Sequence, residues 1–514
     1  MDEPSAAVPD ATMIVLLMRL ARHLLLALCA AALLQASLSS EETLLANAIT
    51  ASELRAHVSF LASDPLEGRD TPSKGLDVAA EYIASEFRRA GLESAGDEGY
   101  FQTAPFATVT ENTAEFRFSI EADGKTISVP LKTVRADAES RFEGKDLPVV
   151  KVSMADEDSA LDPEKLAGKA VVAERPDFGS IVEDKRQDAY EKMLRIRAKL
   201  VKSKAVLLIE ATANLGPPGP RLTDLSGRTK APPPSITIRD TAFREFAKGL
   251  SVGETSAKVS AHVEASDIQK VKLKNVVGLL RGSDPALKDS YVIVSGHYDH
   301  LGKQGDSIYS GANDDASGTA AMLSLAEAVA QLKERPKRSI LFVAYFGEEK
   351  GLLGSRYYGA HPLVPLARTI ANLNLEQLGR TDDSEGKNVK RVFVTGFDYS
   401  NLHEWLVAAG HETGVTFYKH ATNSDSFFGR SDNQSLADAG VPAHTLGTAF
   451  LFADYHQTGD HWDKLDYDNM ALVTRTIGVA LVRLANSPKP VVWSMDNPKA
   501  ANYVKAAKGL HASN

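Results

Sequence analysis

Acidic residues gather where three apolar segments of the chain end. The segments and the residues at their ends are VIVSGHYDHLG with His297 and Asp299, SILFVAYFGEEKG with Glu348 and Glu349, and TIANLNLEQLG with Glu376. Continuous apolar runs of this length are typical of buried strands in a parallel sheet, where ligands collect outside the carboxyl ends of the strands. The three ends therefore predict one shared site, and buried acids at this density require a cation.

The residue types at this site predict which metal it binds. Asp314, in the segment GANDDASG, and His456, in ADYHQTGDHWDKLDY, add a carboxylate and a second imidazole. Two imidazoles with several carboxylates and no sulfur suit zinc best, with manganese or cobalt as alternatives. Two ions about 3.5–4 Å apart need a bridging carboxylate and a water between them, and that water is the expected nucleophile.

Several of these residues also have a purely structural interpretation. Asp299 can accept the second ring N–H of a metal-bound His297. Asp314 and Asp315 form a good N-cap for the helix expected over AAMLSLAEAVAQL, and one can cap while the other binds metal. Glu348 and Glu349 could form a solvated turn, but the strand before them is apolar on both faces and therefore central. Four further histidines are interpreted as structural: His300, His361, His444 and His461.

Other common catalytic motifs are absent from the sequence. It contains no HExxH zinc helix, no GxSxG elbow, no P-loop and no GxGxxG. A formal net charge of -9 argues against binding to nucleic acid. These absences leave metal-dependent hydrolysis, which is compatible with a peptide substrate.

The N-terminal region predicts export. Residues Met18 to Ser40 combine a basic start, an apolar stretch and a small-residue exit, as a signal peptide does. The only cysteine, Cys29, lies inside this region, so the exported chain would carry no disulfide. No later segment approaches the roughly 20 apolar residues that a membrane span needs. We therefore expect a periplasmic or secreted protein without a membrane span.

The 514 residues are too many for one simple core. We expect a signal region over 1–40, a helical first part of the catalytic domain over 41–108, a β-rich insertion over 109–266, the main catalytic part over 267–488 and a polar tail over 489–514. The alternation of strands and helices after about Asn275 predicts an α/β fold with a mixed, mostly parallel sheet sandwiched by helices.

These motifs together resemble the family of co-catalytic di-zinc exopeptidases that includes aminopeptidase Y, bacterial leucyl aminopeptidases and glutamate carboxypeptidase. GHYDHLG, GANDDASG, FGEEKGLLGS, NLEQLGR and YHQTGDHWDKLDY occur in the family's order and spacing. The segments LASDPLEGRDTPSKG and GYFQTAPF are similar to its N-terminal region. The insertion, with LAGKAVVAERPDFG, resembles a protease-associated (PA) domain.

The resemblance implies a role for each residue of the site. His297, Asp314 and Glu376 would hold one zinc ion, and Asp314, Glu349 and His456 the other, with Asp314 as the bridge. Glu348 would be the general base and Asp299 the partner of His297. Tyr455 would stabilise the oxyanion and Arg430 contact the substrate carbonyl. The resemblance also implies a cis peptide bond between Asp314 and Asp315.

Two residues depart from the family pattern: Glu376 replaces the aspartate of many members, and Asn433 replaces a histidine in the substrate pocket. The expected function is an exported zinc aminopeptidase acting on peptides. The alternatives are a carboxypeptidase or dipeptidase, a glutaminyl-cyclase-like enzyme, or a non-catalytic receptor on the same fold. The filled ligand positions and Glu348 disfavour the last.

Overall fold

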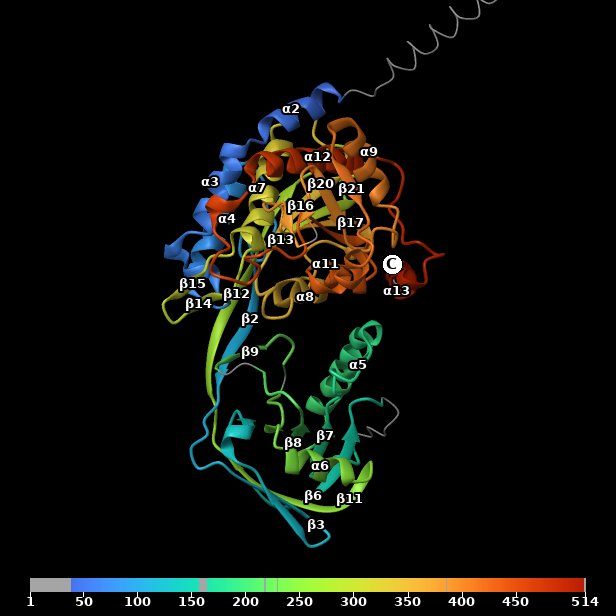
Figure 1. The fold of residues 1–514 in the computed structure, drawn as a ribbon. Coiled ribbons are helices and arrows are strands. Elements are labelled where there is room, and N and C mark those ends of the chain that lie inside the picture. Colours follow the sequence, from blue (N-terminus) through green and yellow to red (C-terminus); the bar gives the residue numbers. More distant parts are fainter. Residues whose placement is uncertain (1–37, 157–163, 217–218, 229, 385, 513–514) are drawn as a thin grey trace, which may run out of the picture. The chain divides into compact units, whose positions relative to one another are not determined.

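A computed structural model describes residues 38–156, 164–216, 219–228, 230–384 and 386–512 (Figure 1). It divides them into two compact units. Unit 1 combines the residues up to Tyr100 with those from Val276 onward, and unit 2 is Phe101–Asn275. The predicted signal peptide, apart from residues 38–40, and Cys29 lie outside the described residues.

Unit 1 is built on a mixed sheet. Its strands run in the order β21 (Thr416–Tyr418), β20 (Arg391–Val394), β22 (Ala443–Gly447), β17 (Thr369–Leu375), β13 (Tyr291–His297), β16 (Ser339–Tyr345) and β12 (Asp267–Leu280), of which the part from Val276 onward belongs to unit 1. The four central strands, β22, β17, β13 and β16, are parallel, whereas β12 pairs antiparallel with β16. Every residue of β13 and β16 is buried, as their continuous apolar sequences predict.

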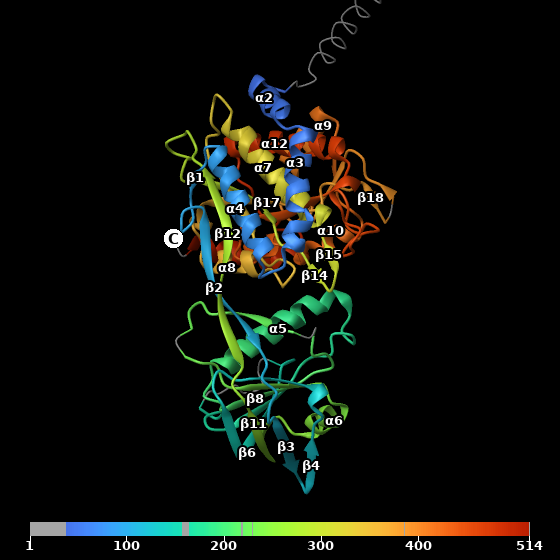
Figure 2. The ribbon, with the colours of Figure 1, turned by 90° about the vertical axis from the view of Figure 1, so that its left-hand side faces the viewer.

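Helices cover both faces of this sheet. One face carries α2 (Ser40–Ala48), α3 (Ala51–Leu61), α4 (Lys74–Arg89), α7 (Ser317–Ala330), α9 (His403–Thr413) and α12 (Tyr467–Asn486). The other carries α8 (Leu353–Ala360), α11 (Asn433–Asp438) and α13 (Ala501–Ala512). Figure 2 shows α3, α4, α7 and α12 side by side over the sheet. The predicted α/β sandwich with a mixed, mostly parallel sheet is confirmed.

Short elements complete unit 1. They are β1 (Glu93–Ser94), β14 (Gly302–Gln304), β15 (Ser307–Tyr309), β18 (Asp382–Asp383), β19 (Gly386–Lys387) and α10 (Asn423–Ser426). The C-terminal segment, expected to be a polar tail, packs Trp493 into the core, where its ring stacks on Tyr503 at 5.0 Å. Val491, Trp493 and Ala500 are buried, whereas Val492 and Met495 are exposed, so the segment is anchored to the core at a few positions and is otherwise largely exposed.

Unit 2 is rich in β-structure. Its eight-stranded sheet has the order β4 (Lys125–Ser128), β3 (Arg117–Ala122), β11 (Gly253–Val263), β6 (Phe142–Ser153), β7 (Ala170–Glu174), β8 (Leu207–Ala211), β10 (Ser235–Ile238) and β5 (Val134–Asp137). It also contains α5 (Glu183–Val201), α6 (Thr241–Gly249), β2 (Phe101–Thr110) and β9 (Arg221–Asp224). The predicted boundaries at 109 and 266 fall inside β2 and just before β12. Its likeness to a PA domain stays a prediction.

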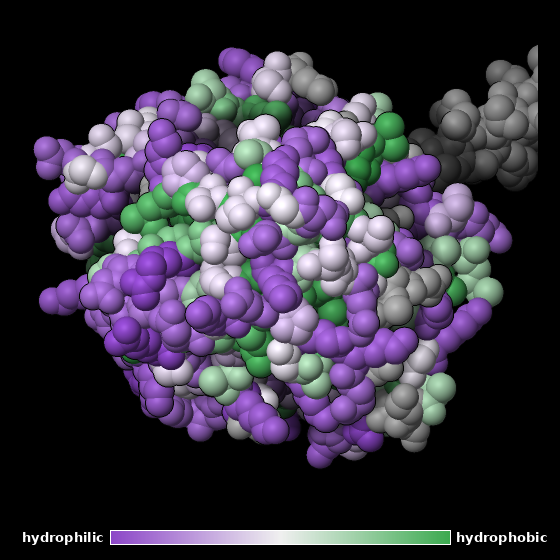
Figure 3. All heavy atoms as spheres, turned by 90° about the horizontal axis from the view of Figure 1, so that it is seen from below, coloured by the Kyte–Doolittle hydropathy of each residue, from purple (hydrophilic) through white to green (hydrophobic). Residues whose placement is uncertain are grey.

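Hydrophilic residues cover most of the face shown in Figure 3, and hydrophobic ones form small, scattered patches. Within the described ranges, none of the helices combines the length and apolar character that crossing a membrane requires.

Candidate metal centre

Three neighbouring strands bring the predicted ligands to one edge of the sheet. β13 ends at His297, β16 ends shortly before Glu348 and Glu349, and β17 ends immediately before Glu376. β13 lies between β16 and β17 and is parallel to both. Their carboxyl ends therefore meet at one place, as the sequence predicts.

The two aspartates in the segment before α7, Asp314 and Asp315, have different contacts. Asp315 accepts the backbone N–H of Gly318 at 3.0 Å, as a helix cap does, and that of Gln377 at 3.1 Å. Asp314 instead faces His297 and His456. The peptide bond between the two aspartates is cis, which confirms that expectation. Asp315 thus joins α7 to the end of β17, and Asp314 is left for the site.

The donor atoms around Asp314 have the spacing of metal ligands. His297 Nε2 lies 3.3 Å from Asp314 Oδ1, and His456 Nε2 lies 3.2 Å from Oδ2 and 3.3 Å from Glu349 Oε1. Tetrahedral zinc with bonds of about 2.0–2.2 Å sets its ligand atoms about 3.3–3.6 Å apart, whereas charged hydrogen bonds are about 2.7–2.9 Å long. The distances fit ligands that share an ion better than groups that bond to one another.

Glu376 joins the same cluster on the His297 side. One ligand atom from each of His297, Asp314 and Glu376 lies within 4.8 Å of the others. Its longer side chain, which departs from the family's usual aspartate, therefore still reaches the cluster. Asp314 belongs to both halves of the site, as a bridge between two ions must.

Buried atoms without partners support a bound cation. Among the described residues, His297 Nε2, Glu349 Oε1 and Glu376 Oε2 are buried and have no hydrogen-bond partner. Leaving such atoms unsatisfied costs roughly 1–3 kcal/mol each, more when they are charged. The donor set of imidazole and carboxylate suits zinc. The residues present fit a zinc pair.

The pKa values show the same excess of negative charge. Burial lowers the pKa of His456, but its contacts with Asp314 and Glu349 outweigh this and raise it to about 10. Burial raises the pKa of Glu376 to about 7, and repulsion from Asp314 adds to this. The site therefore favours positive species.

Glu348 lies beside the cluster without belonging to its closest set. Its Oε2 is 4.0 Å from His297 Nε2. Burial, with repulsion from Glu376 and Glu349, raises its pKa well above the usual range, although His297 acts in the opposite direction. This position, near the ligands but apart from them, suits a group that exchanges protons.

The closest contact of the His297 ring with Asp299 is to the backbone carbonyl oxygen, not to the carboxylate that the sequence predicts. His297 Nδ1 is 3.2 Å from the backbone carbonyl oxygen of Asp299 and 3.6 Å from its Oδ1. The Asp299 carboxylate instead accepts the backbone N–H of Glu348 at 3.0 Å and the hydroxyl of Thr71 at 3.2 Å. Asp299 therefore ties the loop carrying Glu348 to the strand carrying His297.

Tyr455 and Arg430 line a small cavity of about 50 Å³ at the cluster, together with Asp314, Glu348, Glu376 and His456. The Tyr455 ring stacks on His456 with centroids 4.1 Å apart. The guanidinium carbon of Arg430 lies 4.4 Å from the centre of the Phe427 ring. Both residues therefore border the space that a substrate would occupy.

An aromatic wall of this cavity was not found from the sequence. Phe393, Phe427 and Phe450 line it, with the Phe393 and Phe450 rings stacked at 3.5 Å. They come from β20 and two separate loops, so no local pattern marks them. Asn433 is buried behind the cavity, where it accepts a hydrogen bond from the Thr445 hydroxyl and donates one to the Phe428 carbonyl.

Two further residues of the centre were missed. His300, interpreted from the sequence as structural, has Nδ1 2.8 Å from Glu349 Oε1. Asp460 accepts the backbone N–H groups of Asn313 at 2.9 Å and Asp314 at 3.1 Å. The only sequence signal for either is position, since His300 follows Asp299 and Asp460 follows His456 by four residues.

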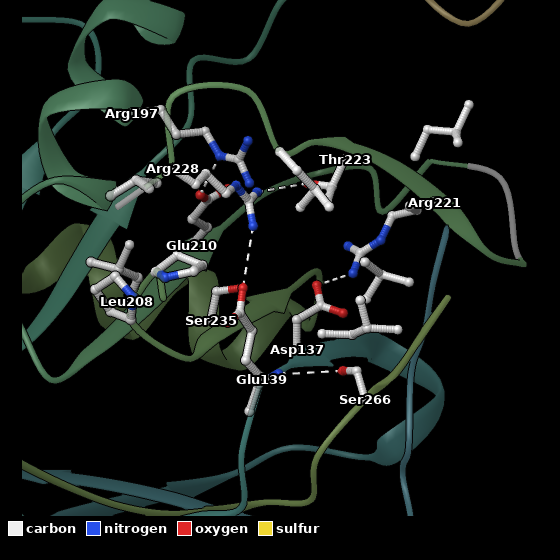
Figure 4. Close-up of a pocket in the computed structure, with 18 residues that line it drawn as sticks. Asp137, Glu139, Arg197, Leu208, Glu210, Arg221, Thr223, Arg228, Ser235 and Ser266 are labelled. Carbon is white, nitrogen blue, oxygen red and sulfur yellow. Dashed lines mark hydrogen bonds and ion pairs between the residues drawn. The ribbon is translucent and has the colours of Figure 1, made fainter. Parts of the chain in front are cut away.

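Unit 2 contains a larger cavity of about 360 Å³ (Figure 4). Its wall is largely apolar, and its arginines are each paired with a carboxylate: Arg197 with Glu210, Arg221 with Asp137, and Arg228 with Glu139. Its size suits a small molecule. None of the predicted metal ligands lines it, so cavity size alone does not mark the reaction site.

Unit 2 also brings together Glu115, His262 and Glu264. Both ring nitrogens of His262 are already paired, with Glu143 and with Glu264. Arg141 lies 3.6 Å from Glu264 and supplies further positive charge. This cluster is balanced without a metal ion.

Comparison with known proteins finds a family match for part of unit 1. Residues 275–481 match peptidase family M28. A probable zinc metalloprotease from Pyricularia oryzae is 37% identical over 270 residues, which cover 43% of this chain and 51% of that protein. Leupeptin-inactivating enzyme 1 from Streptomyces exfoliatus is 27% identical over 238 residues, covering 43% and 48%.

A solved structure shares the fold. The aminopeptidase from Aneurinibacillus sp. strain AM-1 aligns with a TM-score of 0.52 and 20% identity over 89% of this chain and 98% of that one. The chain spans about half or less of the length of the curated relatives reported above. The region matched to the family carries His297, Asp314, Glu348, Glu349, Glu376 and His456. The resemblance seen in the sequence is thus confirmed, because residues 275–481 of this chain match the model of peptidase family M28.

Proposed function

We propose that this protein is a zinc-dependent exopeptidase, and specifically an aminopeptidase that removes N-terminal residues from peptides. The observation that carries the proposal is the arrangement around Asp314, whose two carboxylate oxygens each lie 3.2–3.3 Å from a different histidine. A carboxylate shared in this way between two imidazoles is what a two-ion hydrolytic site needs. Glu348 beside it provides a proton acceptor.

His297, Asp314 and Glu376 would hold one zinc ion, and Asp314, Glu349 and His456 the other. Bound zinc would supply a Lewis acid that lowers the pKa of a water molecule at the site. Glu348 would take one proton from the attacking water as the water oxygen bonds to the scissile carbonyl carbon. Glu348 then returns the proton to the leaving nitrogen as the C–N bond breaks.

Tyr455 and Arg430 would act on the carbonyl oxygen of the substrate. Burial and the surrounding carboxylates raise the pKa of Tyr455 far above the usual range, so its hydroxyl stays protonated. A protonated hydroxyl at the cavity wall can donate a hydrogen bond to the developing oxyanion. Arg430 contributes a fixed positive charge at the same cavity.

The residues that line the cavity also indicate which substrates the site would prefer. Phe393, Phe427 and Phe450 form an apolar wall next to Glu376 and His456. A peptide whose N-terminal residue has a large apolar side chain would bury it against these rings. Zinc would neutralise the carboxylates that bind it, so the apolar wall, rather than the charge of the cluster, carries this preference.

Arg430 supports a second candidate, a carboxypeptidase. An arginine at the cavity can bind a terminal carboxylate in bidentate fashion. The stacking of Arg430 on Phe427 uses the face of the guanidinium and leaves its N–H edge available. We place the carboxypeptidase second because the aligned solved structure is that of an aminopeptidase.

A panel of aminoacyl anilides tests the proposal. Leucyl, phenylalanyl and alanyl anilides, each with a free or acetylated amino group, are assayed alongside peptides with free or amidated C-termini. Cleavage of the free anilides, lost with a chelator and restored by zinc, is the expected result. Equal cleavage of acetylated substrates would contradict the aminopeptidase, and dependence on a free C-terminus would favour the carboxypeptidase.

Export is proposed on the sequence of residues 18–40 alone. Expression of the full chain in a bacterial host, followed by fractionation and N-terminal sequencing, tests it. A processed protein outside the cytoplasm, starting close to residue 40, is expected. An unprocessed cytoplasmic protein would contradict it.

A further inference from the structure

A third imidazole lies at the candidate metal centre. His300 is fully buried and follows Asp299 just beyond the end of β13. Its Nδ1 is 2.8 Å from Glu349 Oε1, and its ring meets that of His456 edge-on at 5.7 Å. The residue set predicted from the sequence and its family resemblance gives His300 no role.

The distances from Glu349 Oε1 to the two imidazoles distinguish two roles for His300: metal ligand or hydrogen-bond donor. Glu349 Oε1 is 3.3 Å from His456 Nε2, within the spacing of two ligands of one ion, but only 2.8 Å from His300 Nδ1. About 2.7–2.9 Å is the range of a charge-assisted hydrogen bond and is too short for two ligands of one tetrahedral ion. His300 Nδ1 and Glu349 Oε1 are close but are not aligned as a hydrogen bond in this structure, and one ligand atom from each of His300, Asp314 and Glu349 lies within 4.8 Å of the others. The shorter distance favours His300 as a partner of the Glu349 carboxylate and His456 as the ligand of the ion.

The surroundings of His300 hold its ring in this position. Its backbone N–H donates to the carbonyl oxygen of Arg69 at 3.3 Å. Gly311 approaches the ring so closely that a β-carbon there would lie 2.4 Å from His300 Cγ. The ring thus fills space that only a glycine leaves open, which restricts its movement on that side.

A carboxylate that binds a metal ion has two oxygens and a freely rotating terminal bond, so its orientation needs a second partner. For Glu349, the other close contact is His456, which is itself an expected ligand. His300 is the contact that remains when His456 is engaged by an ion. A neutral ring with its proton on Nδ1 can donate to Glu349 without adding charge.

We propose that His300 is a positioning residue that donates its Nδ1–H to Glu349 and so orients this carboxylate for the ion shared with His456. The proposal rests on the zinc pair of the proposed function but not on its substrate. Loss of the donor weakens this position about 10–100-fold, which is typical for partners of metal ligands. The position formed by His297 and Glu376 keeps its affinity.

Three variants separate donation from space filling. His300→Asn keeps an N–H donor near the place of Nδ1, His300→Gln keeps a similar volume but carries its donor farther out, and His300→Ala keeps neither. His411→Ala, an exposed histidine of α9, is the control. Circular dichroism and thermal unfolding establish that each variant is folded.

The measurement is zinc binding by the full chain in a series of zinc buffers, with the metal content read directly and Co²⁺ absorption as a second signal. The wild type and His411→Ala are expected to hold two ions. His300→Gln and His300→Ala should show the weaker ion shifted about 10–100-fold, with His300→Asn near the wild type. Because Asn and Gln are both amides of comparable size, their comparison stays decisive even if the alanine variant does not fold.

Three results would overturn the proposal: unchanged zinc affinity in both His300→Gln and His300→Ala, an equal loss in Asn and Gln, or a shift of both ions together. Failure of the proposed function is distinguishable. A wild type that binds two ions but cleaves no peptide contradicts the peptidase and leaves the role of His300 standing.

Discussion

Arg69 donates a hydrogen bond from Nε to the carbonyl oxygen of Tyr298 across 2.7 Å, and its side chain is fully buried. The same guanidinium donates to the carbonyl oxygens of Ser310 at 2.8 Å and Gly311 at 2.9 Å. Tyr298 follows His297, and Gly311 precedes Asp314 by three residues. Arg69 thus links the N-terminal segment to the two stretches of chain that carry His297 and Asp314.

Arg69→Ala is expected to destabilise the protein by about 3–5 kcal/mol, because several buried carbonyl groups lose a charged donor. Burial lowers the pKa of Arg69 to about 10, so it remains charged near neutral pH. Urea unfolding measures the effect. Arg89→Ala, which removes an exposed pair with Glu327, is the control and should cost less than about 1 kcal/mol. Equal losses in the two variants would contradict this.

Glu348→Gln is expected to keep its zinc and lose about 10²–10⁴-fold in kcat, because the amide cannot accept the proton of the water. Metal analysis and kinetics on a leucyl anilide measure the two quantities. Glu349→Gln is the matched control, since the neighbouring substitution should reduce the zinc content itself. A fully active Glu348→Gln would show that the mechanism is wrong.

His297→Ala and His456→Ala should each lose zinc, because each removes an imidazole from a different side of Asp314. Zinc content after gel filtration is the measurement, with His411→Ala as the control. Two ions retained in either variant would remove that histidine from the ligand set.

Phe427→Ala should lower kcat/KM for leucyl and phenylalanyl substrates about 10-fold or more, with little effect on alanyl substrates, because it removes apolar surface from one wall of the cavity. The matched control is Phe397→Ala, a half-buried phenylalanine that stacks on His403 and does not line this cavity. A uniform loss across all substrates would contradict a role in specificity.

Burial of His444 should make the free energy of unfolding decrease as the pH is lowered. Its Nδ1 donates to the Thr395 carbonyl at 2.8 Å, its Nε2 lies 2.7 Å from the Ser400 hydroxyl, and burial lowers its pKa to about 4. As the pH falls below about 6.5, His444 becomes protonated in the unfolded chain but stays neutral in the folded protein. His444 therefore contributes about 3 kcal/mol to the free energy of unfolding above pH 6.5, and this contribution is lost between pH 6.5 and 4.

Urea unfolding at pH 7.5 and pH 4.5 tests this for the wild type and His444→Gln. The variant should be less stable at pH 7.5, because it loses the paired ring, but the difference should shrink at pH 4.5. Comparison of the two proteins cancels groups they share. His411→Gln controls for a general effect of removing a histidine, and a constant difference across pH would contradict the prediction.

Local signals explain why much of the candidate site could be predicted. His297, Glu348, Glu349 and Glu376 follow strands whose apolar runs already indicate that they are central and buried. Chain direction then decides where these residues lie, because parallel strands end at one edge. The α/β sandwich and the peptidase family followed from the same runs and motifs.

Other parts of the centre depend on contacts that no local pattern announces. His300 became part of it only because the turn after β13 brings Nδ1 to Glu349, and Arg69 because a distant N-terminal segment packs beneath the same turn. Phe393, Phe427 and Phe450 come from separate elements and look like ordinary core residues in the sequence. The sequence by itself determined which chemistry the strand ends carry, since residue type and strand order are written along the chain. Only the tertiary structure decided which side chains orient the ligands and shape the cavity, because these depend on distances between segments that folding brings together.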